Sequence, residues 1–153
     1  MTLVKRFDHV GVTVRDLRAA TTFFKSLGLE PDGDPQIAEG GWLEDVIGID
    51  GARVEVVTLR APGDSPGIEL ARFHHPAHEH GPHTAAASEP RLRSVALEVH
   101  DLDTAVATVQ RDGYELVRTI GNYQDVFRLC YIRGPQQIIV LVAHGPAADP
   151  RGP

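Results

Sequence analysis

The sequence predicts an α+β fold built from two copies of a β-α-β-β-β module, and three observations lead to it. Residues 7–31 align with residues 92–116 without a gap, at an offset of 85. In each copy an alternating apolar run is followed by an apolar stripe at helical spacing. Further strand-like runs then follow in both copies, in matching order. A repeat of this kind predicts two equivalent modules, each with its helix on one side of a sheet.

Each copy opens with a predicted strand. In the first copy, positions 10, 12 and 14 are all valine, and Phe7, His9, Gly11 and Thr13 would occupy the opposite face. Alternation with β-branched residues is typical of a strand with one buried face. The second copy repeats the pattern, with Ser94, Ala96 and Glu98 opposite Val95, Leu97 and Val99. At the offset of 85, His9 of the first copy falls on Ser94 of the second.

A helix follows each of these strands. Asp16 and Asp101 are the predicted N-caps, because a short carboxylate accepts hydrogen bonds from first-turn amides and complements the helix dipole. Gly28 and Gly113 are the predicted ends, at positions that favour a positive φ. The apolar stripes have helical spacing in both copies: Leu17, Ala20, Phe24 and Leu27 in one, and Leu102, Ala105, Val106 and Val109 in the other.

Three further strands are expected in each copy. They cover residues 40–46, 53–60 and 68–73 in the first copy, and residues 115–120, 126–133 and 138–143 in the second. The last two strands align through the match of Leu59-Arg60-Ala61-Pro62 with Ile132-Arg133-Gly134-Pro135. With one deleted residue allowed, Glu69 falls on Leu141.

The expected organisation is one domain made of two modules. The first module covers residues 1–73 and the second residues 91–144. Residues 74–90 are polar and contain proline, so we expect a linker there, and the Pro/Gly-rich tail 145–153 is expected to be disordered. The linker carries a histidine cluster without a known zinc spacing, which favours a solvated segment over a metal site: His74, His75, His78, His80 and His83.

Composition excludes some classes of partner. The chain has 153 residues, a net charge of −6 and a pI near 5.7, whereas a nucleic-acid-binding surface is normally basic. No run of apolar residues approaches the length of a membrane span or a signal peptide, so a cytoplasmic protein is expected. Cys130 is the single cysteine, which rules out an internal disulfide and predicts a small buried apolar side chain.

Four stretches carry a resemblance to a known superfamily. FDHVGVTVRDL, GIELARF, RSVALEVHDLD and RLCYIRGPQQIIVLV resemble the vicinal oxygen chelate superfamily, which includes glyoxalases, epimerases, extradiol dioxygenases and bleomycin resistance proteins. The resemblance runs from about Phe7 to His144. It implies paired modules whose sheets curl into an open cup with the helices outside, and commonly a homodimer. The fold hosts several chemistries, so it does not select a reaction.

The resemblance also implies a metal site with four ligand positions. They fall on His9, Glu69, Ser94 and Leu141, of which only the first two carry metal-binding side chains. Three interpretations follow. His9 and Glu69 bind a ligand directly without metal, a partner chain or the linker histidines complete the site, or a divalent metal (Zn, Ni, Mn, Co or Fe) binds through two protein ligands plus substrate oxygens. The first is favoured, because protein metal sites usually supply three or more ligands.

Other candidates for ligand contact are less specific. Glu98 shares a strand face with Ser94, but it is also consistent with a solvated rim residue. Depending on the strand register, Arg128 or Tyr131 lines the cup and contacts an anionic or carbonyl group. Trp42 either covers an apolar substrate or belongs to the core or an interface.

Two functions follow from these residues. The first is a lyase or isomerase of the glyoxalase or epimerase type, or a dioxygenase, that acts on a small substrate with vicinal oxygens. Glu69 is then the catalytic carboxylate or a metal ligand, and His9 is a ligand. The alternative is a metal-free protein that binds a small molecule, as bleomycin resistance proteins do, and the two unfilled ligand positions motivate it. A catalytically inactive domain with a role in assembly is a third option.

Overall fold

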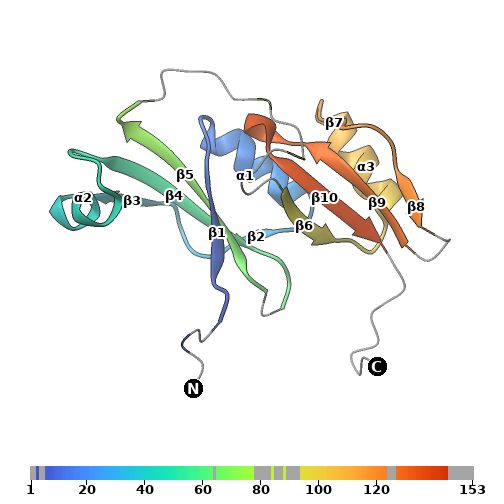
Figure 1. Cartoon of the computed structure of the whole chain (residues 1–153), viewed down its shortest axis with the longest axis horizontal. Coiled ribbons are helices and arrows are strands. Elements are labelled where there is room, and N and C mark those ends of the chain that lie inside the picture. The colour runs from blue at the N-terminus through green and yellow to red at the C-terminus, as the bar shows by residue number, and fades with distance from the viewer. Residues whose placement is uncertain are drawn as a thin grey trace. The chain divides into compact units, whose positions relative to one another are not determined.

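The computed structural model describes residues 3, 6–63, 65–77, 84, 88, 94–123 and 127–144. The chain divides into two compact units, Met1–Pro82 and His83–Pro153 (Figure 1). The division lies inside the segment 74–90 that the sequence predicts to be a linker. Most of that segment and the whole tail 145–153 lie outside the described residues.

The first unit is a mixed five-stranded sheet with two helices. Its elements are β1 (His9–Thr13), α1 (Leu17–Ser26), β2 (Glu30–Pro31), β3 (Gln36–Glu39), α2 (Gly41–Ile47), β4 (Arg53–Arg60) and β5 (Gly67–His75). The strand order is β1-β5-β4-β2, and β3 also pairs with β4. β1 runs parallel to β5, whereas the other pairs are antiparallel.

The second unit repeats this topology. Its elements are β6 (Ser94–Glu98), α3 (Leu102–Arg111), β7 (Glu115–Leu116), β8 (Gly121–Tyr123), β9 (Phe127–Arg133), the 3-10 turn η1 (Pro135–Gln137) and β10 (Ile139–His144). The order is β6-β10-β9-β7, with β8 also on β9 and β6 parallel to β10. Of the strand predicted at 115–120, only Glu115–Leu116 is a strand (β7), and the next strand, β8, begins after it at Gly121.

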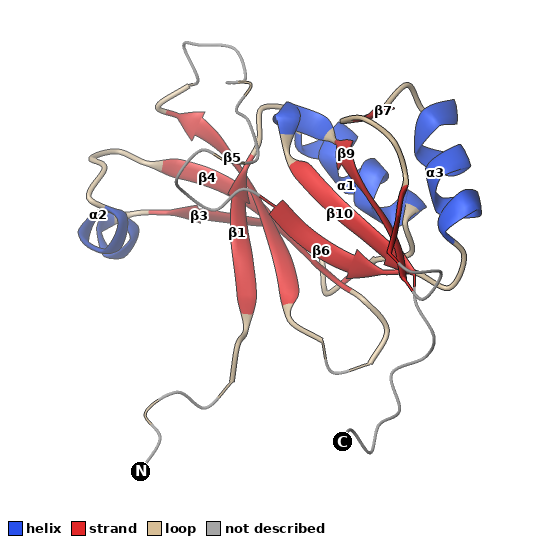
Figure 2. Cartoon of the chain, turned by 45° about the vertical axis from the view of Figure 1, so that its right-hand side comes forward, coloured by secondary structure: helices blue, strands red, loops and turns tan. Residues whose placement is uncertain are grey.

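One predicted strand is wrong. Residues 40–46 do not form a strand, because α2 covers Gly41–Ile47 and the strand before it, β3, ends at Glu39. The apolar residues of this segment, Trp42, Leu43, Val46 and Ile47, have the spacing of a helix rather than the alternation of a strand. Gly48, with φ of 71°, ends the helix in the left-handed conformation. Figure 2 shows α2 beyond the end of β3.

The predicted helix ends of α1 and α3 are confirmed. The Asp16 carboxylate accepts a hydrogen bond from the Ala19 amide at 2.9 Å, and the Asp101 carboxylate accepts one from the Thr104 amide at 3.0 Å. Gly28 and Gly113 follow the helices at φ of 100° and 89°. In both units the same cap begins the helix and the same glycine lets the chain turn back to the sheet.

Each helix covers one face of its own sheet. In the first unit α1 contacts β4 and β5, and its buried side chains are Leu17, Ala20, Phe23 and Phe24. The strand residues on this face are equally buried: Val57, Leu59, Ile68 and Leu70. In the second unit α3 contacts β10 and buries Leu102, Val106 and Val109. Cys130 is buried as predicted, and that burial raises the pKa of its thiol.

A smaller core lies on the other face of the first sheet. Leu43 of α2 packs with Ala52 and Val54, and five partly buried apolar residues surround them: Ala38, Ile49, Val56, Ala71 and Phe73. By strand alternation, Val56 and Ala71 share a face with Glu69. Thus α2 covers one end of the face opposite α1 and leaves the end near β1 to polar residues.

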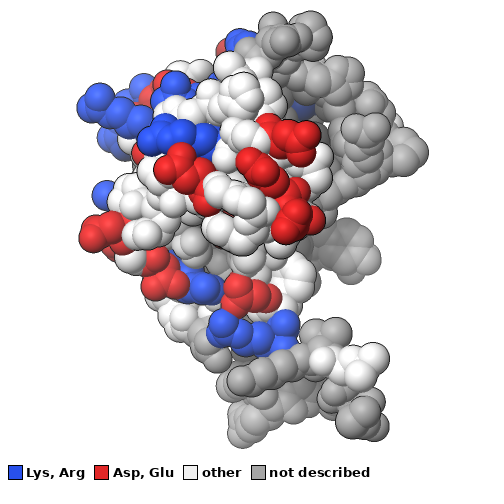
Figure 3. Space-filling model, turned by 90° about the vertical axis from the view of Figure 1, so that its left-hand side faces the viewer, with Lys and Arg blue, Asp and Glu red and all other residues white. Residues whose placement is uncertain are grey.

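Charges of both signs are mixed on the surface. The face in Figure 3 carries Lys and Arg side chains next to Asp and Glu side chains. Every helix of the described residues is too short or too polar to cross a bilayer.

Candidate functional site

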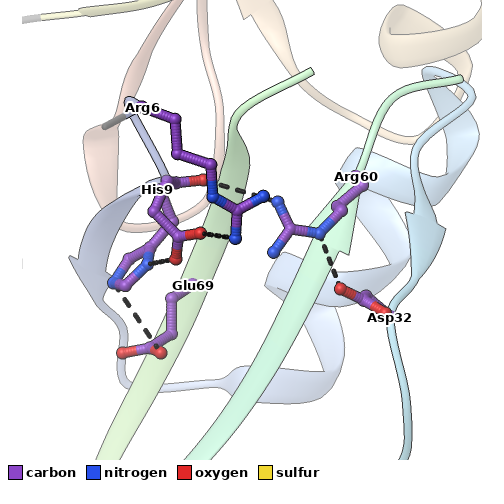
Figure 4. A network of polar contacts seen from close by, with 6 residues as sticks. Arg6, His9, Asp32, Arg60 and Glu69 are labelled. Atoms are coloured by element: carbon purple, nitrogen blue, oxygen red, sulfur yellow. Dashed lines mark hydrogen bonds and ion pairs between the residues drawn. The ribbon is translucent and has the colours of Figure 1, made fainter. Parts of the chain in front are cut away.

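His9 and Glu69 are brought together by the parallel pairing of β1 with β5. Gly11 lies opposite Glu69 and His9 lies opposite Gly67, so both side chains project from the same face of the sheet. His9 Nε2 and Glu69 Oε2 are 3.8 Å apart (Figure 4). The two side chains are 38% and 35% exposed, which leaves them accessible to a ligand.

Asp8 orients the His9 ring. Its carboxylate Oδ2 lies 2.8 Å from His9 Nδ1, which turns Nε2 toward Glu69. Because a carboxylate only accepts, this contact places a proton on Nδ1. The hydrogen bond with His9 is the main reason that the pKa of Asp8 lies below its ordinary value, and Arg6 and Arg60 act in the same direction. Sequence analysis missed Asp8, although a carboxylate next to a candidate histidine ligand was a visible signal.

Two arginines border this group of residues. Arg6 donates to the Asp8 carboxylate, and Arg60 donates from Nε to Asp32 Oδ2 at 2.6 Å (Figure 4). Arg60 Nη1 also reaches the Asp8 carbonyl oxygen at 3.4 Å. In the register of the sheet, His9, Gly67 and Arg60 form one row across β1, β5 and β4. The row holds the guanidinium of Arg60 next to the backbone that carries His9.

Space remains beside Glu69. A Cβ atom built on Gly11, the residue opposite Glu69, would meet no heavy atom within 4 Å. Because Gly11 has no side chain, the space next to Glu69 on the neighbouring strand is open.

His9 and Glu69 offer a divalent metal one imidazole nitrogen and one carboxylate. A metal at about 2.1 Å from both His9 Nε2 and Glu69 Oε2 is possible when these atoms are within about 4.2 Å of each other, so the pair alone could share an ion. Among the described residues, however, no three His, Cys, Asp or Glu side chains gather to hold a metal. Two ligands do not fit a resident metal centre, which normally has at least three from the protein.

The strands of the second unit pair in the same register as those of the first, but they lack the histidine and the glutamate. Ser94 pairs with Ile139 and Ala96 with Leu141, as His9 pairs with Gly67 and Gly11 with Glu69. The alignment of Glu69 with Leu141 is thus confirmed by the pairing of the strands.

The remaining candidates fall on different faces. Tyr131 lies opposite Leu141 in the β9–β10 pairing and so shares the face of Ser94 and, by alternation, of Glu98. Arg128 lies on the other face, where its guanidinium makes two hydrogen bonds to the Asp103 carboxylate of α3 at 2.8 and 2.9 Å. Asp103 raises the pKa of Arg128. Of the two alternatives, the register selects Tyr131 for the face of the ligand positions.

Trp42 and two of the five histidines predicted to lie in the linker are among the described residues. Trp42 lies on α2 with 62% of its surface exposed, and is not a core residue. His74 and His75 belong to β5 rather than to a linker, and His74 Nε2 lies 2.9 Å from Glu55 Oε2. By alternation this second His–Glu pair is on the sheet face opposite Glu69. His78, His80 and His83 lie outside the described residues.

Solved structures similar to this chain have the same fold. A glyoxalase family protein from Bacillus cereus is 32% identical, with a TM-score of 0.88 over 94% of this chain and 96% of that one. A glyoxalase/bleomycin resistance protein/dioxygenase domain from Frankia sp. is 15% identical, with a TM-score of 0.62 over 94% and 99%. The trypanothione-dependent glyoxalase I of Leishmania major is 15% identical, with a TM-score of 0.60 over 92% and 87%.

Sequence comparison agrees with the structural one. No curated protein matched the chain. The family model described as Glyoxalase/Bleomycin resistance protein/Dioxygenase superfamily matches residues 8–131, which is most of the chain and includes both His9 and Glu69. The chain therefore belongs to the glyoxalase/bleomycin resistance protein/dioxygenase superfamily.

Proposed function

We propose that this protein is a lyase or isomerase of the glyoxalase or epimerase type that acts on a small substrate with vicinal oxygens. The observation that carries the proposal is the His9–Glu69 pair, whose Nε2 and Oε2 atoms are 3.8 Å apart. The pair lies on an accessible sheet face, next to the open space at Gly11. Glu69 supplies a carboxylate that can accept and return a proton. His9 supplies an imidazole that can bind a substrate oxygen.

Glu69 is the proposed general base. In an isomerisation it takes the proton from a carbon next to a carbonyl group and returns a proton to the neighbouring carbon. The reaction needs no other reactant, since one proton leaves the substrate and one returns, and the proton held by Glu69 can exchange with solvent in between. General acid–base catalysis by one positioned group typically contributes about 10² to 10⁴ in rate.

His9 is the proposed holder of the substrate oxygen. The Asp8 carboxylate accepts a hydrogen bond from Nδ1–H, which holds the ring with Nε2 on the Glu69 side. A substrate hydroxyl donates to Nε2, which places the neighbouring carbon next to the Glu69 carboxylate. Orientation of this kind by an outer carboxylate is common for functional histidines.

A second candidate is a metal-free binding protein that sequesters a small molecule. The observation that favours it is the pairing of Ser94 and Leu141 at the positions equivalent to His9 and Glu69. The second unit thus offers no carboxylate or imidazole at those positions, and His9 with Glu69 would then serve as hydrogen-bonding groups for a ligand.

Deuterium exchange in heavy water tests the first proposal and separates it from the second. The probes are methylglyoxal mixed with a thiol and a 2-methyl-branched CoA thioester, followed by NMR at the carbon next to the carbonyl. We expect protein-catalysed exchange of at least one probe, and a loss of about 100-fold in Glu69→Gln. The matched control is Glu55→Gln, which alters the other His–Glu pair of the same sheet and should leave the rate within about twofold.

Metal dependence is measured in the same assay. The protein is stripped with a chelator and then supplied with Zn, Ni, Mn, Co or Fe, with metal content determined on tag-free protein. A rate that requires one metal at stoichiometry, lost in His9→Ala, would add a metal to the proposed mechanism. Catalysed exchange at full rate in Glu69→Gln would overturn Glu69 as the base, and binding of a probe without exchange would favour the second candidate.

A further inference from the structure

Helix α2 exposes an apolar face that the proposed function does not use. Trp42 and Val46 lie one turn apart on the same side of the helix, and 62% and 75% of their surfaces are exposed. Leu43 buries the other side of α2 against Ala52 and Val54. A surface helix normally carries polar residues on its outer side. α2 therefore has an apolar outer face in addition to the one that packs within its own unit.

Trp42 is the single tryptophan of the chain. Its indole ring lies beside Gly40, since a Cβ atom built on that glycine would be 3.8 Å from Trp42 Cδ1. This contact supports one edge of the ring, while most of the side chain remains open to solvent. Tryptophan is enriched among the residues that contribute most to binding at protein interfaces. Trp42 thus has the setting of an anchor residue for a partner.

The segment that contains α2 is strongly acidic. Residues 26–52 include seven of the chain's 21 Asp and Glu residues and none of its 15 Lys and Arg residues. Glu39 is paired with Arg53, at 3.1 Å. Three further acidic residues lie in α2 or within three residues of its end: Glu44, Asp45 and Asp50. Figure 3 views the molecule from the side on which α2 lies, and Asp and Glu side chains border uncharged surface there.

We propose that these residues form a docking surface, the α2 surface, for a basic amphipathic helix of another protein. The surface consists of an apolar centre and an acidic border: Trp42, Val46, Glu44, Asp45 and Asp50. The apolar side of the incoming helix packs on the centre, and its Lys and Arg side chains meet the acidic border. Amphipathic helices are commonly recognised in this way, through apolar anchors at helical spacing and complementary charge at the edges.

The charge of the α2 surface disfavours two other occupants. A two-fold interface between two copies of this chain would use the same patch on both, so the acidic border of one copy would meet that of the other and be repelled. A lipid bilayer is unfavourable for the same reason, because the cytoplasmic leaflet of membranes is negatively charged. A basic partner alone gains from both the apolar centre and its border.

The fluorescence of Trp42 tests the proposal on the full-length protein, because no other tryptophan contributes. The probe is a peptide of about 15 residues with leucine at helical spacing and lysine elsewhere. One control peptide replaces lysine by glutamate, and another has the leucine and lysine residues in scrambled order. We expect the Leu/Lys peptide alone to shift the emission saturably to shorter wavelengths, at a Kd of about 100 μM or tighter. The Kd should rise with added salt.

Two variants of exposed residues test the assignment, each with a matched control in the second unit. Asp45→Lys places a positive charge opposite the lysines of the peptide and should weaken binding at least about fivefold. Val46→Ser removes part of the apolar centre and should weaken it to a similar degree. The controls are Asp112→Lys and Val117→Ser, which make the same changes at exposed residues outside the α2 surface and should alter the Kd less than about twofold.

Each outcome decides the proposal. A saturable shift with the Leu/Lys peptide that both α2 variants weaken and both controls preserve would support it. No saturable shift, an equal shift with either control peptide, or unchanged binding in either α2 variant would overturn it. A shift that appears without peptide as the protein is concentrated would assign the surface to a second copy, and a shift with phosphatidylserine vesicles would assign it to a bilayer. Either would also overturn the proposal. Because emission is read without turnover, the result is independent of the exchange experiment on Glu69.

Discussion

Gly67 lies directly beneath the guanidinium of Arg60. A Cβ atom at this position would be 3.1 Å from Arg60 Nη1, and 3.3 Å from both the Leu59 carbonyl oxygen and Thr58 Cγ2. The absence of a side chain is what allows Arg60 to reach across β5 to the Asp8 carbonyl next to His9. The polar border of the candidate site therefore depends on a glycine that is itself no part of the chemistry.

Gly67→Ala should destabilise the protein by about 1–3 kcal/mol, because two of the three close atoms are backbone or a short branched side chain that cannot move away. Denaturant unfolding measures the change. Gly11→Ala is the control, since its Cβ would meet nothing within 4 Å, and its stability should stay within about 0.5 kcal/mol of wild type. Equal losses in both variants would contradict the role given to Gly67.

Asp8→Ala should lower the turnover proposed for His9 and Glu69 by about 10- to 100-fold, because Asp8 holds the imidazole with Nε2 toward Glu69. Asp8→Asn keeps an acceptor for Nδ1 and should recover part of the rate. The ratio kcat/KM for each variant tests this order, and equal rates in the two variants would show that the contact with His9 does not orient the ring.

Stability at acid pH should reflect the cap of α3. The pKa of Asp101 is lowered below 3.8, chiefly by the hydrogen bond from the Thr104 amide. A carboxyl whose pKa is lower in the folded state contributes stability above its unfolded pKa, and this contribution is lost as the pH falls through the folded value. Asp101→Asn keeps a cap but does not titrate.

The free energy of unfolding of Asp101→Asn should therefore fall less steeply than that of wild type between about pH 5 and pH 2. Asp101→Ala, by contrast, should lower the free energy of unfolding at neutral pH as well, because it removes the cap itself. Chemical unfolding at several pH values provides both numbers. Identical slopes in wild type and Asp101→Asn would show that the carboxylate is not favoured by folding.

Tyr131 and Arg128 should differ in their effect on ligand binding. Tyr131 shares the face of Ser94, whereas Arg128 is bound to Asp103 on the helix side of the same sheet. Tyr131→Phe should change the affinity for a ligand of that face, and Arg128→Gln should not. Exposed ion pairs contribute little, so Arg128→Gln should also leave the stability of the protein nearly unchanged. Isothermal titration calorimetry and denaturant unfolding distinguish the two variants.

Much of the fold was visible in the sequence because the repeat supplied each element twice. The caps at Asp16 and Asp101 were predicted from local chemistry that tertiary contacts leave unchanged. The strand at 53–60 was predicted with its true ends. Helix α2 was missed, since its counterpart does not occur among the described residues of the second unit and its apolar residues were assigned to a strand.

The sequence predicted only those residues of the candidate site whose side-chain type alone suggests a function. His9 and Glu69 qualified, and the strand register then brought them together. Asp8 and the pair of Asp32 with Arg60 did not, because their roles depend on side-chain contacts. The contacts of Arg60 join residues that are 28 and 52 positions apart, and that of Asp8 depends on the orientation of the neighbouring His9 ring. Alternation within β9 places Arg128 and Tyr131 on opposite faces, but which of them faces the helix followed only from the structure.

The parallel pairing of β1 with β5 also has a kinetic consequence. His9 belongs to the first strand of its unit and Glu69 to the last, so the intervening helices and strands must form the crossover before these two strands can pair. Contacts between distant parts of a chain form slowly, because a long loop must close first. Assembly of the pair should therefore coincide with completion of the whole first unit, and a nascent chain that ends before β5 would have the histidine without its carboxylate.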